Sequence, residues 1–179
     1  MIYLIRHAEP SAGWGDHLDP GLSELGARQA SAASLALTEA GAKRAVTSPL
    51  ARCRETARTF EKQIETHARI DPAIGEIRTP AGIADRPAWL RTIMAGNWGE
   101  AGEGLETWRT ETLMAVERCA PDTAIFSHFV AINAIVGLLA GDDRVLIFRP
   151  AHCSITRLER RAGRLVVAQR GEEGAAVLL

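Results

Sequence analysis

Short apolar runs alternate along this chain with stretches of helical periodicity, and this alternation restricts the folds that the chain can adopt. The apolar runs lie at 2–6, 43–48 and 123–128, and the helical stretches lie at 23–40, 49–65, 103–119 and 129–141. Strands that alternate with helices form a mainly parallel sheet with helices on both faces. We therefore expect an α/β protein with three layers, α/β/α.

The rest of the chain adds strands near the C-terminus and one irregular stretch. Three further strand-like segments lie at 144–148, 153–158 and 164–169. A short turn at Ala162–Gly163 joins the last two, which predicts an antiparallel addition to the sheet. Residues 71–102 are rich in proline and glycine, which favours a functional loop or lid, with a surface excursion as the alternative. No linker or repeat divides the chain, so residues 1–179 are expected to form one domain.

Two helix starts have local signals. Ser23 is suited to cap the helix at 23–40, and Glu24 stands in its first turn. Ser48 and Pro49 predict a second start, with the serine as cap and the proline at the first helical position.

Composition excludes several classes of partner. The formal net charge of -1 argues against a nucleic-acid platform, since such proteins usually have a basic excess. No apolar run approaches the ~18 residues of a membrane span, and the N-terminus lacks the pattern of a secretory signal. The three cysteines are scattered without metal-binding or disulfide spacing, so we expect a cytoplasmic protein.

Polar residues with catalytic potential stand where the predicted strands end. Arg6 and His7 follow the first strand, and His128 follows the strand at 123–128. Ligands of open α/β sheets bind outside the carboxyl ends of the strands, so both histidines are expected in one crevice. Arg52 lies in the first turn of the helix that follows the second strand. A helix N-terminus together with a guanidinium favours a phosphate group.

Four ordered blocks, LIRHAEP, LSELGARQA, SPLARCRETA and FSHFVAINAIVG, resemble the histidine phosphatase superfamily, also called phosphoglycerate mutase-like. The resemblance runs from Ile2 to about Gly137, and PAHCSITRL is similar to the family's closing strands. It implies the phosphoglycerate mutase-like fold and no cofactor. It also implies that His7 is the transiently phosphorylated nucleophile and that Arg6, Arg52 and His128 bind the phosphoryl group.

The family uses a carboxylate as proton donor, and Glu76 is the candidate because DPAIGEI resembles the family's segment around that acid. The usual continuation of that segment is absent, so Asp71, Glu100 and Glu103 stay as alternatives. Phe129 disfavours the branch with an aspartate directly after the second histidine. Glu9 is expected to organise the loop beneath His7, with an exposed loop carboxylate as the alternative.

The short chain lacks the inserts of the mutases, so hydrolysis of a small-molecule phosphate ester is the expected reaction. The alternatives are mutase-type phosphotransfer, a phosphatase acting on phosphohistidine proteins, and a non-catalytic phospho-ligand binder. A zinc site of His7, Glu9, His128 and His152 is disfavoured because Arg6 and Arg52 would repel a cation. The sequence leaves the oligomeric state and the substrate open. The candidates for lining a specificity pocket, with packing anchors as the alternative interpretation of the aromatic ones, are Trp14, His17, Trp89, Trp98, Phe129 and His152.

Overall fold

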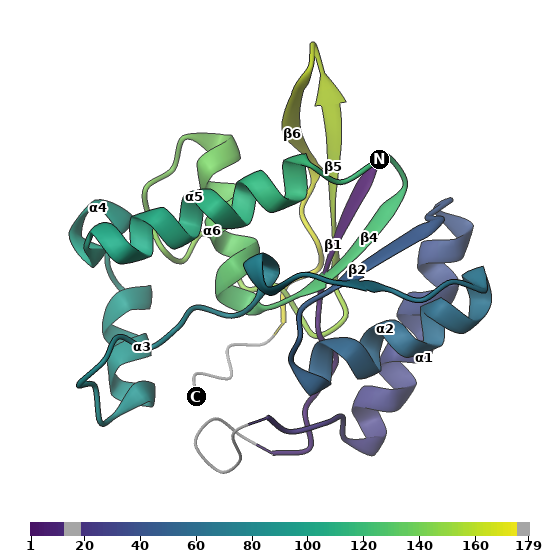
Figure 1. Cartoon of the computed structure of the whole chain (residues 1–179), viewed down its shortest axis with the longest axis horizontal. Coiled ribbons are helices and arrows are strands. Elements are labelled where there is room, and N and C mark those ends of the chain that lie inside the picture. Colours follow the sequence, from purple (N-terminus) through teal and green to yellow (C-terminus); the bar gives the residue numbers. More distant parts are fainter. Residues whose placement is uncertain (13–18, 175–179) are drawn as a thin grey trace.

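The computed structural model describes residues 1–12 and 19–174, and its centre is a six-stranded sheet (Figure 1). The strands are β1 (Ile2–Arg6), β2 (Arg44–Thr47), β3 (Arg69–Ile70), β4 (Thr123–Ser127), β5 (Ile155–Arg161) and β6 (Arg164–Gln169). Their order across the sheet is β3-β2-β4-β1-β5-β6. The first four run parallel, whereas β5 is antiparallel to both β1 and β6. This is the predicted mainly parallel sheet with an antiparallel C-terminal addition.

Helices cover both faces of this sheet. They are α1 (Glu24–Glu39), α2 (Ala51–Ile64), α3 (Arg86–Met94), α4 (Trp98–Ala101), α5 (Glu103–Glu117) and α6 (Phe129–Ala140), with a short 3-10 turn, η1, at Pro72–Ile74. In Figure 1, α1 and α2 lie on one side of the strands and α5 and α6 on the other. The expected three-layer α/β/α architecture is therefore confirmed.

Alternating side chains of β1 explain why the sheet has two cores. Ile2 and Leu4 pack in the cluster that contains residues of α5 and α6. Tyr3 and Ile5 point to the opposite face, into the cluster with α1 and α2. Successive side chains of a strand point to opposite faces, so a strand covered on both sides is apolar throughout.

The two predicted helix caps have different outcomes. The hydroxyl of Ser23 accepts the N–H of Gly26, so Ser23 is the N-cap of α1 as predicted. The prediction for Ser48 and Pro49 was wrong, because α2 begins only at Ala51. The N-cap position is Leu50, and the Asp19 carboxylate accepts the N–H of Ala51, the first helical residue, at 2.8 Å.

Residues 144–148 do not form the predicted strand. The side-chain oxygen of Asn133, on α6, accepts the N–H groups of Ile147 and Phe148 at 2.8 and 3.1 Å. The N–H of Val145 binds the carbonyl of Gly96. These backbone groups are thus bound outside the sheet, although Val145 and Phe148 are buried as an apolar strand would be.

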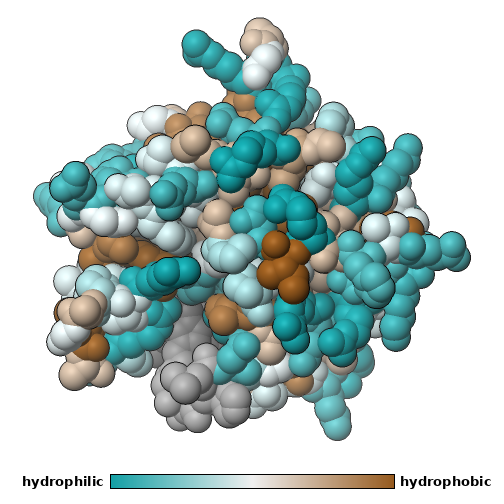
Figure 2. All heavy atoms as spheres, viewed as in Figure 1, coloured by the Kyte–Doolittle hydropathy of each residue, from teal (hydrophilic) through white to brown (hydrophobic). Residues whose placement is uncertain are grey.

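The proline- and glycine-rich stretch is more regular than its composition indicates. It contains η1, α3 and α4, and the side chain of Asp85 caps α3 by accepting the N–H of Ala88. No helix in the described ranges is long and apolar enough to cross a membrane. Hydrophilic side chains dominate the face shown in Figure 2, and its hydrophobic ones lie in small separate groups.

Candidate active site

Two histidines meet at the carboxyl ends of adjacent strands. Arg6 of β1 is in register with Ser127 of β4, so the residues that follow, His7 and His128, are neighbours. The N–H of His7 donates to the carbonyl of Ser127 at 2.9 Å. The centroids of the two imidazole rings are 5.3 Å apart. The structure therefore brings together the two histidines that the sequence placed in one crevice.

The protonation of His7 follows from its surroundings. Its Nδ1 lies 2.8 Å from the carbonyl oxygen of Ala8, which can only accept, so Nδ1 holds the proton. Burial, followed by the charges of His128, Arg52 and Arg6, lowers the pKa of His7 well below its usual value. The ring is neutral at pH 7, and its Nε2 has a free lone pair. A neutral imidazole of this kind can act as a nucleophile.

His128 is fully buried and has polar neighbours at both ring nitrogens. Nη2 of Arg52 lies 3.2 Å from Nδ1, and Oγ of Ser48 lies 2.7 Å from Nε2. A guanidinium can only donate, so Nδ1 accepts and the ring proton is on Nε2, which donates to Ser48. Burial, with the charges of Arg52 and Arg6, lowers the pKa of His128 well below its usual value.

The thiol of Cys53, on α2, completes the surroundings of His128. Its Sγ lies 3.3 Å from Nε2 of His128 and donates to the carbonyl of Ser127 at 3.4 Å. Burial raises the pKa of this thiol far above its usual value, so it stays protonated. Cys53 therefore packs and hydrogen-bonds here as a neutral group.

Arg6 is held rigidly beside the histidines. Its Nη1 donates to the carbonyl of Pro150 at 2.9 Å, and its guanidinium lies over the ring of Phe129, 5.1 Å from the centroid. Burial lowers the pKa of Arg6 to about 10, so the group is still charged at pH 7. Phe129 thus supports a cation of the site, whereas the sequence suggested it as a pocket wall.

Glu76 is the buried carboxyl group of the site, with 8% of its surface exposed. Burial raises the pKa of Glu76, although the N–H of Ile77 and the charges of Arg52, Arg86 and Arg6 oppose the rise. Its second oxygen, Oε2, has no hydrogen-bond partner among the described residues, and neither does Nε of Arg6 or of Arg52. The charges of Arg6 and Arg52 act on the pKa of Glu76, so the three groups lie near one another, and their unpaired atoms are suited to bind a ligand.

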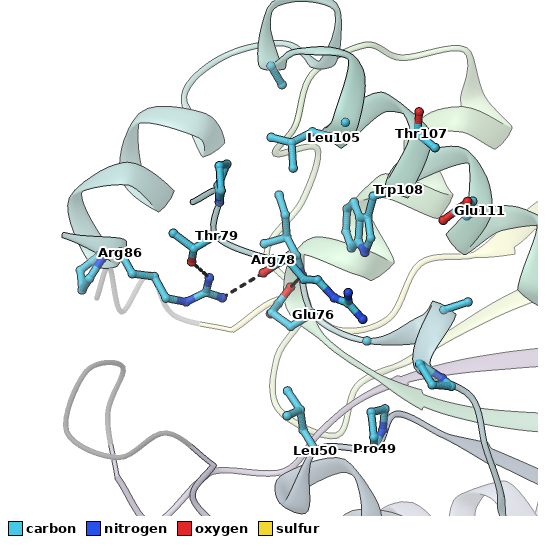
Figure 3. Close-up of a pocket in the computed structure, with 18 of the residues that line it drawn as sticks. Pro49, Leu50, Glu76, Arg78, Thr79, Arg86, Leu105, Thr107, Trp108 and Glu111 are labelled. Carbon is cyan, nitrogen blue, oxygen red and sulfur yellow. Dashed lines mark hydrogen bonds between the residues drawn. The ribbon is translucent and has the colours of Figure 1, made fainter. Parts of the chain in front are cut away.

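A large cavity of about 1320 Å³ opens beside these groups. Arg52 and Glu76 are part of its wall, whereas His7 and His128 are not. Figure 3 shows Glu76, Arg78 and Trp108 around it, with Pro49 and Leu50 on the opposite side. Arg86 is fixed by hydrogen bonds to Thr79 and to the carbonyl of Ile77. A ligand in the cavity would therefore meet both charged and apolar surfaces, and Arg52 would connect it to His128.

The alternative carboxylates are placed less favourably than Glu76. Asp71 accepts the N–H of Ala73 and pairs with Arg69, so it holds η1 and the adjacent strand. Glu100 is exposed, and Glu103 is exposed on the cavity wall. The carboxylate of Glu9 accepts the hydroxyl of Ser23 at 2.7 Å and so ties the loop after β1 to α1.

Gly26 permits this close approach of loop and helix. A Cβ atom at this position would lie 2.1 Å from the carbonyl oxygen of Glu9. The glycine of the LSELGARQA block is therefore needed to pack α1 against the loop that follows His7.

The suggested specificity residues are dispersed. Trp98 is fully buried in the core between α4 and α5, and Trp89 packs against the same cluster, so neither lines the cavity. Trp14 and His17 lie outside the described residues. His152 lies beside His7, with 5.6 Å between ring centroids. Within 1–12 and 19–174, no group of three or more His, Cys, Asp or Glu side chains is arranged to hold a metal ion.

The roles of three residues of the site were not predicted from the sequence. Ser48 was read as a helix cap, but its hydroxyl binds the ring of His128. Arg86 and Trp108 were read as parts of a loop and a helix face, but both line the cavity. The position of Ser48 directly after a strand, like that of His7 and His128, was a signal that could have identified it.

Comparison with known proteins gives a consistent family relationship. Residues 2–173 match the family described as the histidine phosphatase superfamily (branch 1). Proteins named "Probable phosphoglycerate mutase GpmB" from Erwinia tasmaniensis and Photorhabdus laumondii are 24% and 23% identical over 185 residues. These alignments cover 90% and 89% of this chain and 85% and 84% of the relatives.

Solved structures share the fold at low identity. Phosphoserine phosphatase from Entamoeba histolytica, in complex with 3-phosphoglyceric acid, has a TM-score of 0.76 at 18% identity and covers 99% of this chain and 98% of its own. Mycobacterial glucosyl-3-phosphoglycerate phosphatase in complex with VO3 has a TM-score of 0.71 at 21% identity, covering 94% and 97%. Alpha-ribazole phosphatase from Shigella flexneri has a TM-score of 0.71 at 19% identity, covering 97% and 98%.

Proposed function

The chain belongs to branch 1 of the histidine phosphatase superfamily, and we propose that it hydrolyses a small-molecule phosphomonoester through a phosphohistidine intermediate on His7. The observation that carries the proposal is the state of His7: a neutral ring with its Nδ1 proton bound to Ala8 and a free Nε2, beside two arginines and a second histidine. Members of this family act on phosphate esters, and several similar structures are phosphatases.

In the first step, the Nε2 lone pair of His7 attacks phosphorus, and the bond between phosphorus and the alcohol oxygen breaks. The charge on the three phosphoryl oxygens is stabilised by Arg6, Arg52 and His128, because phosphoryl transfer depends mainly on positioning and electrostatics. The incoming negative charge raises the pKa of His128. When Nη2 of Arg52 turns from Nδ1 of His128 to a phosphate oxygen, Nδ1 takes a proton from the phosphate monoanion and donates a hydrogen bond back to the phosphoryl group.

Glu76 supplies the proton that the leaving alkoxide needs. Its raised pKa keeps a fraction of the carboxyl groups protonated nearer to neutral pH than for an exposed glutamate. In the second step, a water molecule gives its proton to the Glu76 carboxylate and attacks phosphorus. The P–N bond breaks, inorganic phosphate leaves, and His7 recovers its lone pair.

We place the alcohol part of the substrate in the cavity beside Glu76. Trp108 and Leu105 form an apolar part of the cavity wall, and Arg78 and Thr79 form a polar part. A phosphate ester of a small organic molecule with both polar and apolar parts fits this surface. We also place the protein in the cytoplasm, which the three free cysteines favour.

The test is a phosphate-release screen over a panel of phosphomonoesters, with and without EDTA. Wild type is compared with His7→Ala, and with His67→Ala as a control at an exposed histidine. We expect turnover by wild type and the control, unaffected by EDTA, and none by His7→Ala. Equal activity of the His7 variant, or no hydrolysis of any ester, would contradict the proposal. Transfer to a second substrate molecule in place of water would instead favour a mutase, as the names of the curated relatives suggest.

A further inference from the structure

A third imidazole, that of His152, contacts His7. The ring centroids of His7 and His152 are 5.6 Å apart and their planes are inclined by 40°. The ring of His128 lies at nearly the same separation from His7, 5.3 Å. His128 and His152 are thus both ring neighbours of His7.

The backbone around His152 is fixed in an uncommon conformation. The N–H of Ser154 donates to the carbonyl of Ala151 at 3.1 Å, which closes a tight turn. Cys153, inside this turn, has a φ of 61°, in the left-handed region that residues with a Cβ atom rarely adopt. Such conformations persist where the surroundings impose them, and they concentrate at functional sites.

Hydrogen bonds join this turn to Arg6. The N–H of Cys153 donates to the carbonyl of Arg6 at 3.0 Å, and the N–H of Arg6 donates to the carbonyl of Ser154 at 3.4 Å. The guanidinium of Arg6 binds the carbonyl of Pro150, directly before the turn. Three hydrogen bonds thus hold the turn and the residue before it to Arg6, a proposed phosphate-binding residue. The turn in this position keeps the ring of His152 next to the ring of His7.

The ring nitrogens of His152 are available to a ligand. Neither has a hydrogen-bond partner among the described residues. Burial and the charge of Arg6 lower the pKa of His152 to about 4, although Glu9 opposes this. The ring is neutral at pH 7 and therefore has one N–H donor and one acceptor.

We propose that His152 donates a hydrogen bond from its ring to the phosphoryl group bound at His7, as a further residue of the phosphate pocket. This inference rests on the proposed function for the position of the phosphoryl group. The segment PAHCSITRL would then contribute to phosphate binding and also contribute residues to β5.

Anion binding tests this inference without turnover. Calorimetry gives the dissociation constants of vanadate and inorganic phosphate for wild type, His152→Phe and His152→Gln, with His67→Phe as the matched control at an exposed site. Phenylalanine keeps a ring without a donor, and glutamine keeps an N–H donor without the ring. Loss of a hydrogen bond to a charged group corresponds to about 10- to 100-fold weaker binding. We expect this loss for His152→Phe, and binding within about threefold of wild type for His152→Gln and the control.

Two results would overturn the inference: unchanged binding by His152→Phe, or equal weakening in the phenylalanine and glutamine variants. If His152→Phe does not fold, NMR of the 15N-labelled wild type provides the test. The imidazole resonance of His152 is identified by its loss in His152→Gln. The inference requires that vanadate shifts this resonance. An unmoved resonance would also contradict the inference. Anion binding without hydrolysis of any ester would refute the proposed enzyme activity and still report on His152.

Discussion

Arg52 and His128 lie on different elements, 76 residues apart in the sequence, yet Nη2 of the arginine is 3.2 Å from Nδ1 of the histidine. Their contact joins the large cavity to the buried histidine pair, because Arg52 lines the cavity and His128 contacts His7. It also fixes the tautomer of His128, since a guanidinium can only donate. In the proposed mechanism, Arg52 therefore links the cavity to the surroundings of His7.

The guanidinium of Arg52 is expected to bind phosphate through two donors. Arg52→Lys keeps the charge and loses the planar pair of N–H groups, so we expect about 10- to 100-fold weaker binding of inorganic phosphate. Arg54→Lys, an exposed position on the same helix, is the control and should bind like wild type. Calorimetry measures both. Equal affinities of the two variants would show that Arg52 does not bind the phosphate.

Ser48 is expected to act as a positioning residue for His128. Ser48→Ala removes the oxygen acceptor of the Nε2 proton and leaves only Sγ of Cys53, a weak acceptor, beside this buried donor, so kcat/KM should fall about tenfold. Ser48→Thr restores the hydroxyl and should recover most of the activity. The exposed Ser31→Ala is the control. A kcat/KM of the threonine variant as low as that of the alanine variant would refute the hydrogen-bonding role of Ser48.

Glu76 is expected to protonate the leaving group. Glu76→Gln should lower kcat about 10²- to 10⁴-fold for an alkyl phosphate. The loss should be much smaller for p-nitrophenyl phosphate, whose phenolate leaves with little need of a proton. Steady-state kinetics on the two substrates measures the difference, and an equal loss on both would contradict a role as general acid. Glu103→Gln, on the exposed part of the cavity wall, is the matched control.

The same carboxyl group should affect stability. Burial raises the pKa of Glu76 above its unfolded value, so the folded state binds the proton more tightly. The stabilisation that this tighter proton binding gives to the folded state is fully present below about pH 4.3. It is lost as the pH rises through the pKa of Glu76 in the folded state. Glu76→Gln should therefore be more stable than wild type at pH 7.5 and lose that advantage at pH 4. Urea unfolding at both pH values measures this, and a glutamine variant less stable at pH 7.5 would contradict it.

The histidines should give stability the opposite dependence on pH. Burial and nearby cations hold the pKa values of His7 and His128 well below 6.5, so the unfolded chain binds protons that the folded chain does not. Stability should fall below pH 6.5, by up to about 1.4 kcal/mol per pH unit for each histidine. His128→Gln should flatten this slope, whereas the exposed His67→Gln should not. Urea unfolding in phosphate-free buffer from pH 7 to 5 provides the test, and equal slopes would contradict the burial argument.

The sequence predicted those parts of the molecule that depend on local pattern and on the geometry of parallel strands. Arg6, His7 and His128 follow strand ends, and strands in register bring such residues together. The start of α1 was predictable because Ser23 and Gly26 are close in the chain. In each case the signal lies within a few residues of the feature.

The errors arose from contacts between distant residues. Asp19 accepts the N–H of Ala51, the first residue of α2, and the hydroxyl of Ser48 binds His128 at another strand end. Asn133 binds the backbone of Ile147 and Phe148, so an apolar segment stays outside the sheet. Trp98 occurs in a glycine-rich stretch and is nevertheless fully buried. Ser48 had one local signal, its position directly after a strand, whereas the other pairings have no local pattern.

The central claim is that His7 accepts the phosphoryl group. The direct measurement is rapid quenching during turnover of a phosphomonoester, followed by mass spectrometry of the peptide that contains His7, under alkaline conditions that preserve phosphohistidine. We predict one acid-labile phosphoryl group on His7, formed and lost at rates consistent with turnover and absent from His7→Asn. Turnover without phosphorylation of His7, or with the phosphoryl group on His128 or His152, would contradict the mechanism.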